Sequence, residues 1–170
     1  MSTVEFGPVG PPANPEEQTF CHASAVVIGE AGLLIFGPSG AGKSQLALAL
    51  IAAAETAGLF ARLIGDDRVS LKAIAGRVIV RGHPLILGKV ERRGAGILEL
   101  PFLSATVVRL AVRLVEPNEG PSARFPNEPQ YLQIEGVRLP SIELRQDTAP
   151  NHLAALVLSD PRLRRLLKAI

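Results

Sequence analysis

Residues 37–44 read Gly37-Pro38-Ser39-Gly40-Ala41-Gly42-Lys43-Ser44 and match the pattern G-x-x-x-x-G-K-[ST] at every fixed position. The apolar residues 32–36 before this loop predict a buried strand, and the Leu- and Ala-rich run 45–57 after it predicts a helix. Glycines let backbone N–H groups turn towards phosphate oxygens, and the helix N-terminus adds further free N–H groups. The sequence therefore predicts a nucleotide site in which Lys43 contacts the β- and γ-phosphates and the Ser44 hydroxyl binds Mg²⁺. The alternative is a glycine turn that binds nothing. The loop, its Lys and Ser, and the strand and helix predicted on either side all favour phosphate binding instead.

Composition narrows the class of protein. The chain has 170 residues, a length typical of one domain, and 47% hydrophobic residues, which is ample for a core. No apolar run reaches the ~18 positions of a membrane span, and the N-terminus lacks the series of a secretory signal. A net charge of +2, 4% aromatic residues and no Trp argue against nucleic-acid binding. The single cysteine, Cys21, excludes an internal disulfide, and we expect a cytoplasmic protein.

The order of predicted elements indicates an α/β fold. Residues 1–18, rich in Pro, Gly, Asn and Glu, predict a flexible tail, and residues 19–170 form the predicted domain. Residues 91–96 and 116–129 predict loops, and the C-terminal part predicts helices capped by Asn151 and by Asp160. Strands are predicted at residues 24–28, 32–36, 61–64, 69–74, 77–81, 107–115, 131–134 and 137–144. We expect a P-loop kinase-like domain with a mixed central sheet flanked by helices.

An acidic pair, Asp66-Asp67, follows the predicted strand 61–64. If this strand and the one before the phosphate loop share a parallel sheet, both end at the ligand-binding edge. One carboxylate can then contact the metal or its water shell, while the other accepts a proton from a hydroxyl nucleophile. An isolated Asp-Asp pair is more usually an exposed turn, so its position downstream of the phosphate loop is what favours a functional role.

Two further polar residues are ambiguous on their own. Glu91 lies in a charged run that would ordinarily be solvated. His22 lies just before a predicted strand, where a lone histidine is more often a surface or core-edge residue.

These features gain meaning from their order along the chain. His22 comes before a strand, the phosphate loop and Asp66-Asp67 follow, and Glu91-Arg92-Arg93-Gly94-Ala95-Gly96-Ile97 comes next. This arrangement resembles the catalytic domain of the HPr kinase/phosphorylase family, whose signature is an acidic residue followed by I-R-G-x-G-I. The chain keeps all of that signature but the first Ile, and the resemblance spans about residues 22–156. That bacterial family phosphorylates a seryl hydroxyl of HPr, a small phosphocarrier protein of the sugar phosphotransferase system, and also removes the phosphate with inorganic phosphate.

The resemblance implies a role for each matched residue. Gly37 to Ser44 would bind ATP phosphates. Asp67 would be the general base towards the serine, with His22 beside it. Asp66 would support Ser44 and Mg²⁺, and Glu91 would be a metal ligand. Arg93 matches the signature arginine and would hold phosphate or shape the loop.

The chain also departs from the family pattern. Longer family members carry an N-terminal domain, so the chain resembles a short form consisting of the catalytic domain alone. The late motif V-R-P-G-R-N-L-A is kept only in part, as Leu144-Arg145 and then Asn151 to Ala154, and its second arginine has no counterpart. This departure predicts that phosphorylase activity is weak or absent.

The phosphate loop predicts an ATP- and Mg²⁺-binding protein, and the resemblance implies a protein serine kinase that acts on an HPr-like phosphocarrier protein. The resemblance also implies a homo-oligomer. A small-molecule P-loop kinase, with its acceptor in a polar pocket under a lid, is the enzymatic alternative. A non-catalytic, ATP-dependent switch module is the alternative from another class.

Overall fold

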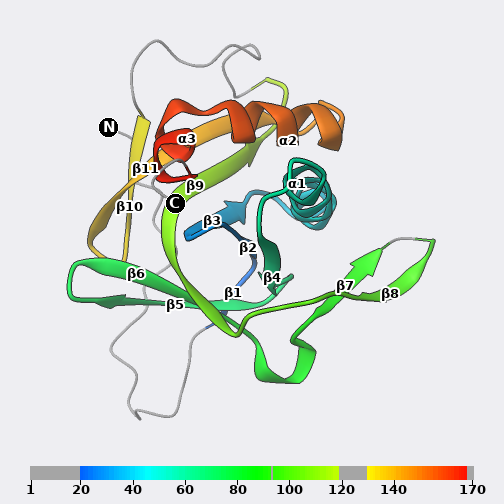
Figure 1. Cartoon of the computed structure of the whole chain (residues 1–170), viewed down its shortest axis with the longest axis horizontal. Coiled ribbons are helices and arrows are strands. Elements are labelled where there is room, and N and C mark those ends of the chain that lie inside the picture. The colour runs from blue at the N-terminus through cyan, green and yellow to red at the C-terminus, as the bar shows by residue number, and fades with distance from the viewer. Residues whose placement is uncertain (1–19, 93, 119–129, 168–170) are drawn as a thin grey trace.

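The computed structural model describes residues 20–92, 94–118 and 130–167 (Figure 1). Its elements, in chain order, are β1 (Phe20–Cys21), β2 (Ser24–Ile28), β3 (Ala31–Phe36), α1 (Lys43–Thr56), β4 (Ala61–Gly65), β5 (Val69–Ile74), β6 (Arg77–Gly82), the 3₁₀ turn η1 (Pro84–Ile86), β7 (Lys89–Arg92), β8 (Gly96–Glu99), β9 (Ala105–Val115), β10 (Gln130–Ile134), β11 (Val137–Arg145), α2 (Pro150–Ser159) and α3 (Pro161–Leu167). Each predicted strand is present, with its ends within two residues of the prediction.

Nine of the described strands form one mixed sheet. Seven follow the order β1-β5-β6-β9-β3-β2-β4, while β11 joins β9 and β10 joins β11. Strand β9 runs parallel to β3 and to β11, and the other neighbours in the sheet are antiparallel. This mixed sheet with packed helices confirms the predicted α/β fold class. Strands β3 and β4 both run antiparallel to β2, so their carboxyl ends lie at the same edge of the sheet.

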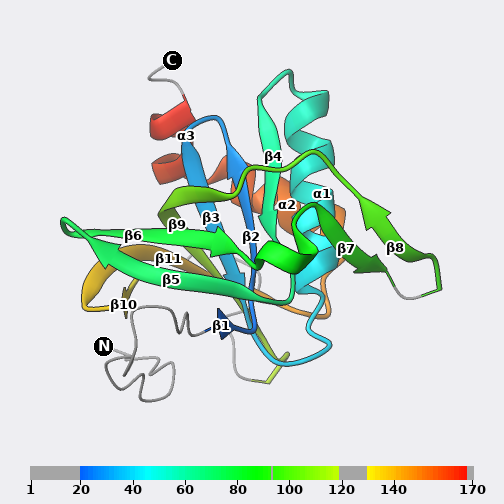
Figure 2. The same ribbon diagram turned by 90° about the horizontal axis from the view of Figure 1, so that it is seen from below.

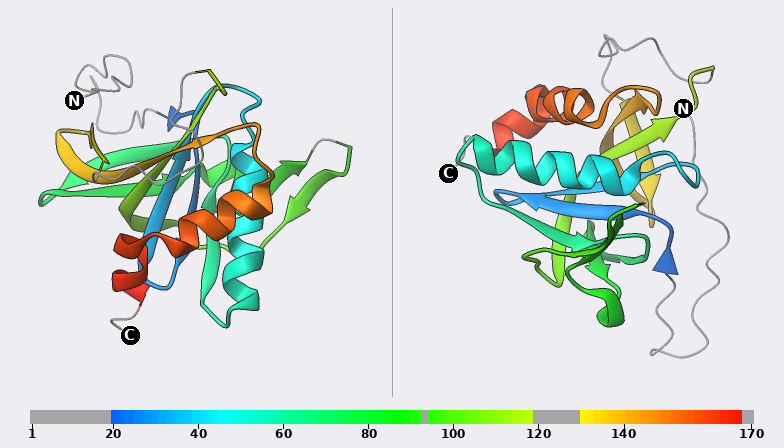
Figure 3. Two further views of the ribbon diagram at one scale, coloured as in Figure 1. Left: turned by 90° about the horizontal axis from the view of Figure 1, so that it is seen from above. Right: turned by 90° about the vertical axis from the view of Figure 1, so that its right-hand side faces the viewer.

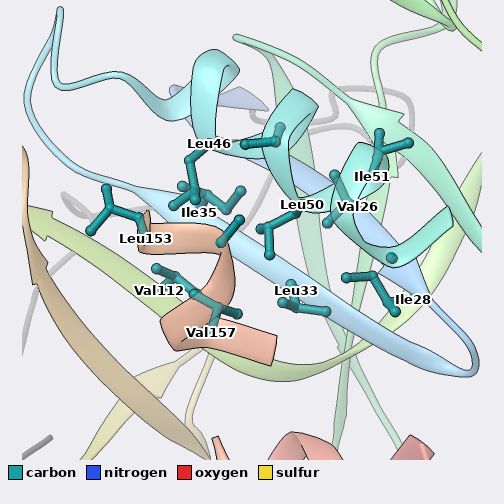
Figure 4. Packing of buried hydrophobic residues seen from close by; sticks show 14 of the residues in the cluster. Val26, Ile28, Leu33, Ile35, Leu46, Leu50, Ile51, Val112, Leu153 and Val157 are labelled. Carbon is teal, nitrogen blue, oxygen red and sulfur yellow. The ribbon is translucent and has the colours of Figure 1, made fainter. Parts of the chain in front are cut away.

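The sheet separates two hydrophobic clusters. The first lies between the sheet and α1, α2 and α3, and Leu46 and Leu50 of α1 meet Val26, Ile35 and Val112 there (Figure 4). The second contains residues of the opposite face together with residues of β5, β6, β10 and β11. The three helices therefore lie on one side of β2 and β3 (Figure 3). Strands β2 and β3 are buried along their whole length, as expected of strands covered on both faces.

The prediction of a loop at residues 91–96 holds for the turn at Gly94 and Ala95 but is wrong at both ends, which lie in strands. Lys89–Arg92 and Gly96–Glu99 pair as the antiparallel hairpin β7–β8, with Glu91 opposite Ile97. Gly94 and Gly96 have φ values of 78° and 79°, a left-handed conformation that suits a turn. The glycines thus let the chain reverse between two strands, and the hairpin projects from the body of the domain (Figure 2).

The helix ends agree with one of the two predicted caps and depart from the other. Gly58 follows α1 with a φ of 74°, and its N–H bonds the carbonyl of Glu55, as a helix-ending glycine should. Asp160 accepts a hydrogen bond from the backbone N–H of Arg162 at 2.8 Å and so caps α3, as predicted. Asn151 does not cap α2, because Pro150 takes the first helical position and Ala149 precedes it as the cap residue.

Two predictions fall outside the described residues: the flexible tail at 1–18, and residues 119–129 of the loop at 116–129. None of the described helices combines the length and the apolarity that a membrane crossing requires.

We predict that Asp160→Ala lowers the free energy of unfolding by about 1–3 kcal/mol. The carboxylate accepts bonds from the Arg162 backbone N–H, from Nε at 3.0 Å and from Nη2 at 2.7 Å, and Arg162 in turn reaches the carbonyls of Gln130 and Ser141. Removing the carboxylate takes away the acceptor of the Arg162 backbone N–H, of Nε and of one of the Nη2 bonds. Urea unfolding measures the loss.

The effect should depend on pH in a defined direction. Burial opposes ionisation of Asp160, but the bonds from Arg162 outweigh it and hold the pKa of the carboxyl below its usual value. The stabilisation is therefore complete above about pH 4 and is lost as the pH falls through the lowered folded-state pKa. Asp147→Ala, which removes an exposed pair with Arg145, is the control and should change stability little. Equal losses for the two variants would contradict the account.

Candidate active site

The phosphate loop joins the end of β3 to the start of α1. A Cβ on Gly37 would lie 2.5 Å from the carbonyl oxygen of Leu114 on β9, so only glycine fits where the loop begins. Gly42 is the residue before α1 and has a φ of 92°. This conformation opens the helix N-terminus, with its free N–H groups, towards the loop.

Lys43 lies folded over this loop. Its side chain is largely buried, and its Nζ donates to the carbonyl of Gly37 at 3.1 Å and to that of Pro38 at 2.8 Å. These carbonyls satisfy the ammonium group inside the loop. The same charge is placed where a nucleotide phosphate would offer stronger, charged acceptors.

Asp66 connects the loop to the sheet. It follows β4, is buried, and accepts hydrogen bonds from Ser44 Oγ at 2.9 Å to Oδ1 and 2.8 Å to Oδ2. Ser24 Oγ on β2 donates to Oδ1 at 2.5 Å. Burial raises the pKa of the Asp66 carboxyl, while the two serine hydroxyls lower it and the neighbouring Asp67 charge adds to the rise.

Asp67 has the opposite environment. Its side chain is 62% exposed, and its Oδ1 lies 2.9 Å from Nδ1 of His22, whose side chain is 75% exposed. The backbone of Asp67 has a φ of 61°, a left-handed conformation that Asp adopts more readily than most residues. This conformation separates two adjacent carboxylates, so that one is buried under the loop and the other faces solvent.

Lys43, Ser44 and the two carboxylates line one cleft of about 350 Å³. The lining residues are His22, Ser39, Gly40, Gly42, Lys43, Ser44, Gln45, Leu48, Asp66, Asp67, Glu91 and Arg92. The structure thus brings together the predicted His22, Lys43, Ser44, Asp66, Asp67 and Glu91 from four separate segments. Arg93 lies outside the described residues.

Glu91 reaches the cleft from strand β7 rather than from a loop. Its neighbour Arg92, which sequence reasoning did not assign, lines the same cleft. Ser24 was also missed. The available signal was a single hydroxyl at the head of the otherwise apolar strand Ser24–Ile28.

The donor set suits Mg²⁺. Carboxylate and hydroxyl oxygens are its preferred protein ligands, and it usually keeps several waters and binds substrate phosphates as well. Within the described ranges, no three His, Cys, Asp or Glu side chains gather closely enough to hold a metal by themselves. Ser44 and Asp66, with phosphate oxygens and water to complete the shell, fit this ion.

A family model for the HPr Serine kinase C-terminal domain matches residues 15–157. The chain belongs to this family. It is 35% identical over 133 residues to the HPr kinase/phosphorylase of Mycoplasma mycoides, covering 72% of the chain and 41% of that relative. The HPr kinase/phosphorylase of Cupriavidus necator is 35% identical over 135 residues, covering 74% of the chain and 39% of the relative.

Structural comparison agrees with this family. The Hpr(Ser) kinase/phosphatase of Coxiella burnetii superposes with a TM-score of 0.68 at 29% identity, covering 90% of this chain and 100% of that one. The curated relatives are longer: the chain spans 41% and 39% of the two named above.

We predict that Lys43→Ala weakens Mg-ATP binding by at least ~100-fold, because a charged contact to phosphate is replaced by none. Calorimetry on the folded variant measures the affinity. Lys72→Ala, which removes an exposed lysine on β5, is the matched control and should bind as the parent does. Unchanged affinity in Lys43→Ala would contradict the assignment.

Proposed function

We propose that this protein transfers the γ-phosphoryl group of ATP to a seryl hydroxyl of an HPr-type phosphocarrier protein. The observation that supports it most is the exposed His22–Asp67 pair on the rim of the phosphate-loop cleft. An acceptor hydroxyl carried on another protein can reach a carboxylate that is 62% exposed. A kinase for a small molecule would instead be expected to enclose its acceptor.

The residues divide the work of the transfer. Lys43 and the loop N–H groups hold the β- and γ-phosphates and neutralise charge that develops on them. Ser44 and Asp66 would hold Mg²⁺, with Glu91 as the further predicted ligand from β7. When bound, Mg²⁺ supplies additional charge neutralisation on the phosphates.

Asp67 is the proton acceptor. Its Oδ1 is occupied by His22 Nδ1, which orients the carboxylate and leaves Oδ2 for the seryl hydroxyl. As the new bond forms between the seryl oxygen and phosphorus, the bond from phosphorus to the ADP oxygen breaks and the seryl proton passes to Asp67. In the phosphorylase direction an oxygen of inorganic phosphate forms the new bond to phosphorus, the bond from phosphorus to the seryl oxygen breaks, and the protonated Asp67 gives its proton to that oxygen as pyrophosphate leaves.

The proposal keeps the remaining predictions from the sequence, which concern the folded unit, the location and the oligomeric state. The folded unit is predicted to be residues 19–170, preceded by a flexible tail at 1–18. The protein is predicted to be a cytoplasmic homo-oligomer.

Labelled ATP tests the proposal. The purified protein is incubated with γ-labelled Mg-ATP and either an HPr-type protein, the same protein with its acceptor serine changed to alanine, or a small-metabolite fraction. Label on the intact HPr-type protein alone is the expected result. Label on a metabolite would favour a small-molecule kinase, and nucleotide binding without transfer would favour a switch module; either would overturn the proposal.

We predict that Asp67→Asn lowers the transfer rate about 100-fold or more while ATP binding is kept, because Asn cannot accept the seryl proton. Asn tolerates the same left-handed backbone, so the fold should be retained. Glu91→Gln is the comparison variant and should instead raise the Mg²⁺ concentration that half-maximal activity requires. Steady-state rates across a Mg²⁺ series separate the two. A parental rate in Asp67→Asn would refute the base assignment, and an unaltered Mg²⁺ requirement in Glu91→Gln would refute the ligand assignment.

We predict that the forward reaction dominates. The reverse reaction must capture free inorganic phosphate together with the phosphoprotein, and so depends more on extra cationic groups. The second arginine of the late motif is missing, and Arg145 is engaged by Asp147 through Nε at 3.1 Å and Nη2 at 2.6 Å. Pyrophosphate release from seryl-phosphorylated HPr and inorganic phosphate should therefore be much slower than forward transfer. Pyrophosphate release at a rate comparable to that of forward transfer would show that another cationic group takes the place of the missing arginine.

A further inference from the structure

Ser24 is a buried hydroxyl in the site that neither the motifs nor the transfer mechanism assigns. It is 0% exposed, heads strand β2, and donates to Asp66 Oδ1 at 2.5 Å. We propose that Ser24 is a positioning residue that sets the orientation of the Asp66 carboxylate for Ser44 and the metal ion of bound ATP. This inference rests on the proposed function, since it concerns the same Mg²⁺-nucleotide site.

The hydrogen-bond geometry explains why the carboxylate needs Ser24. Ser44 Oγ lies within 2.9 Å of Oδ1 and 2.8 Å of Oδ2, but one hydroxyl carries a single proton and donates fully to one oxygen at a time. Ser24 supplies Oδ1 with its own donor. The Ser44 proton is then directed to Oδ2, and the lone pairs of Ser44 remain available to a cation.

The position of Ser24 in the fold suits this task. The β2–β4 ladder begins at the pair Ala25 and Gly65, and a register shift separates it from the next pair. Ser24 directly precedes Ala25 on β2, and Asp66 directly follows Gly65, the last residue of β4. The side-chain bond between them therefore continues the connection of the two strands where the backbone ladder stops.

The short segment from His22 to Ser24, where β2 begins, contacts both members of the acidic pair. His22 meets Asp67, and Ser24, two residues later, meets Asp66. The buried carboxylate has the greater need of a fixed donor, because an oxygen withdrawn from water without a partner is costly. Groups that orient a metal-binding carboxylate in this way typically contribute 10- to 100-fold to metal affinity.

The test measures metal binding directly. Mn²⁺ replaces Mg²⁺ as a paramagnetic probe, and its free concentration is followed by electron paramagnetic resonance during titration of the protein with ATP present. Ser24→Ala removes the hydroxyl, Ser24→Cys keeps the size but is a weak donor, and Ser24→Thr keeps the hydroxyl in a residue that strands accept well. Ser141→Ala, at another buried serine on β11, controls for the loss of a buried hydroxyl.

The expected pattern separates positioning from a purely structural role. Ser24→Ala and Ser24→Cys should bind Mn²⁺ roughly 10-fold more weakly or worse, Ser24→Thr should stay within about threefold of the parent, and Ser141→Ala should match the parent. ATP affinity measured with a chelator present should be the same in all of them. Urea unfolding identifies any variant that fails to fold. If Ser24→Ala is such a variant, the comparison of Ser24→Cys with Ser24→Thr separates the two roles by itself.

Two results would overturn the inference. If the unmodified protein binds Mn²⁺ with ATP, and Ser24→Ala or Ser24→Cys binds it with the same affinity, then Ser24 only fills space. The proposed function would still stand. No metal-dependent nucleotide binding in the unmodified protein would refute the proposed function and this assignment with it.

Discussion

A single buried carboxylate, that of Asp66, ties together the elements on which this site depends. It follows β4 and accepts hydrogen bonds from Ser24 of β2 and Ser44 of α1. A carboxylate out of water is tolerated only when its oxygens are well supplied with donors. The bonds that satisfy this charge therefore also fix the first turn of α1 against the edge of the sheet, and with it the phosphate loop.

The two adjacent carboxylates differ because the chain turns sharply between them. Asp66 is buried against α1, whereas Asp67, with its left-handed backbone, points its side chain into solvent beside His22. A buried carboxylate under hydroxyl donors suits a metal and its waters, and an exposed one beside an imidazole suits an incoming hydroxyl. Backbone conformation and burial thus give two neighbouring residues of one type the different environments that the two proposed roles require.

Sequence reasoning recovered those parts of the fold that depend on local pattern. The continuously apolar strands β2 and β3 and the loop at residues 37–44 are local signals, and they placed the two strands and the strand–loop–helix unit correctly. The β7–β8 hairpin was missed because Gly94 and Gly96 suggest a loop as readily as a turn between strands. The role of Ser24 depends on a contact 42 residues away, which no local pattern contains. The roles of Asp67 and Glu91 were inferred from family resemblance, and the structure adds that both line the cleft.

The central claim is that this edge of the sheet is built to receive Mg-ATP. A crystal structure with Mg²⁺ and a non-hydrolysable ATP analogue tests it most directly. We predict that the Lys43 amine leaves the carbonyls of Gly37 and Pro38 for the β- and γ-phosphates, and that the ion binds Ser44, with Asp66 in contact with it or with its waters. A triphosphate held elsewhere, or a Lys43 amine still bonded to the two carbonyls beside a bound nucleotide, would contradict the account.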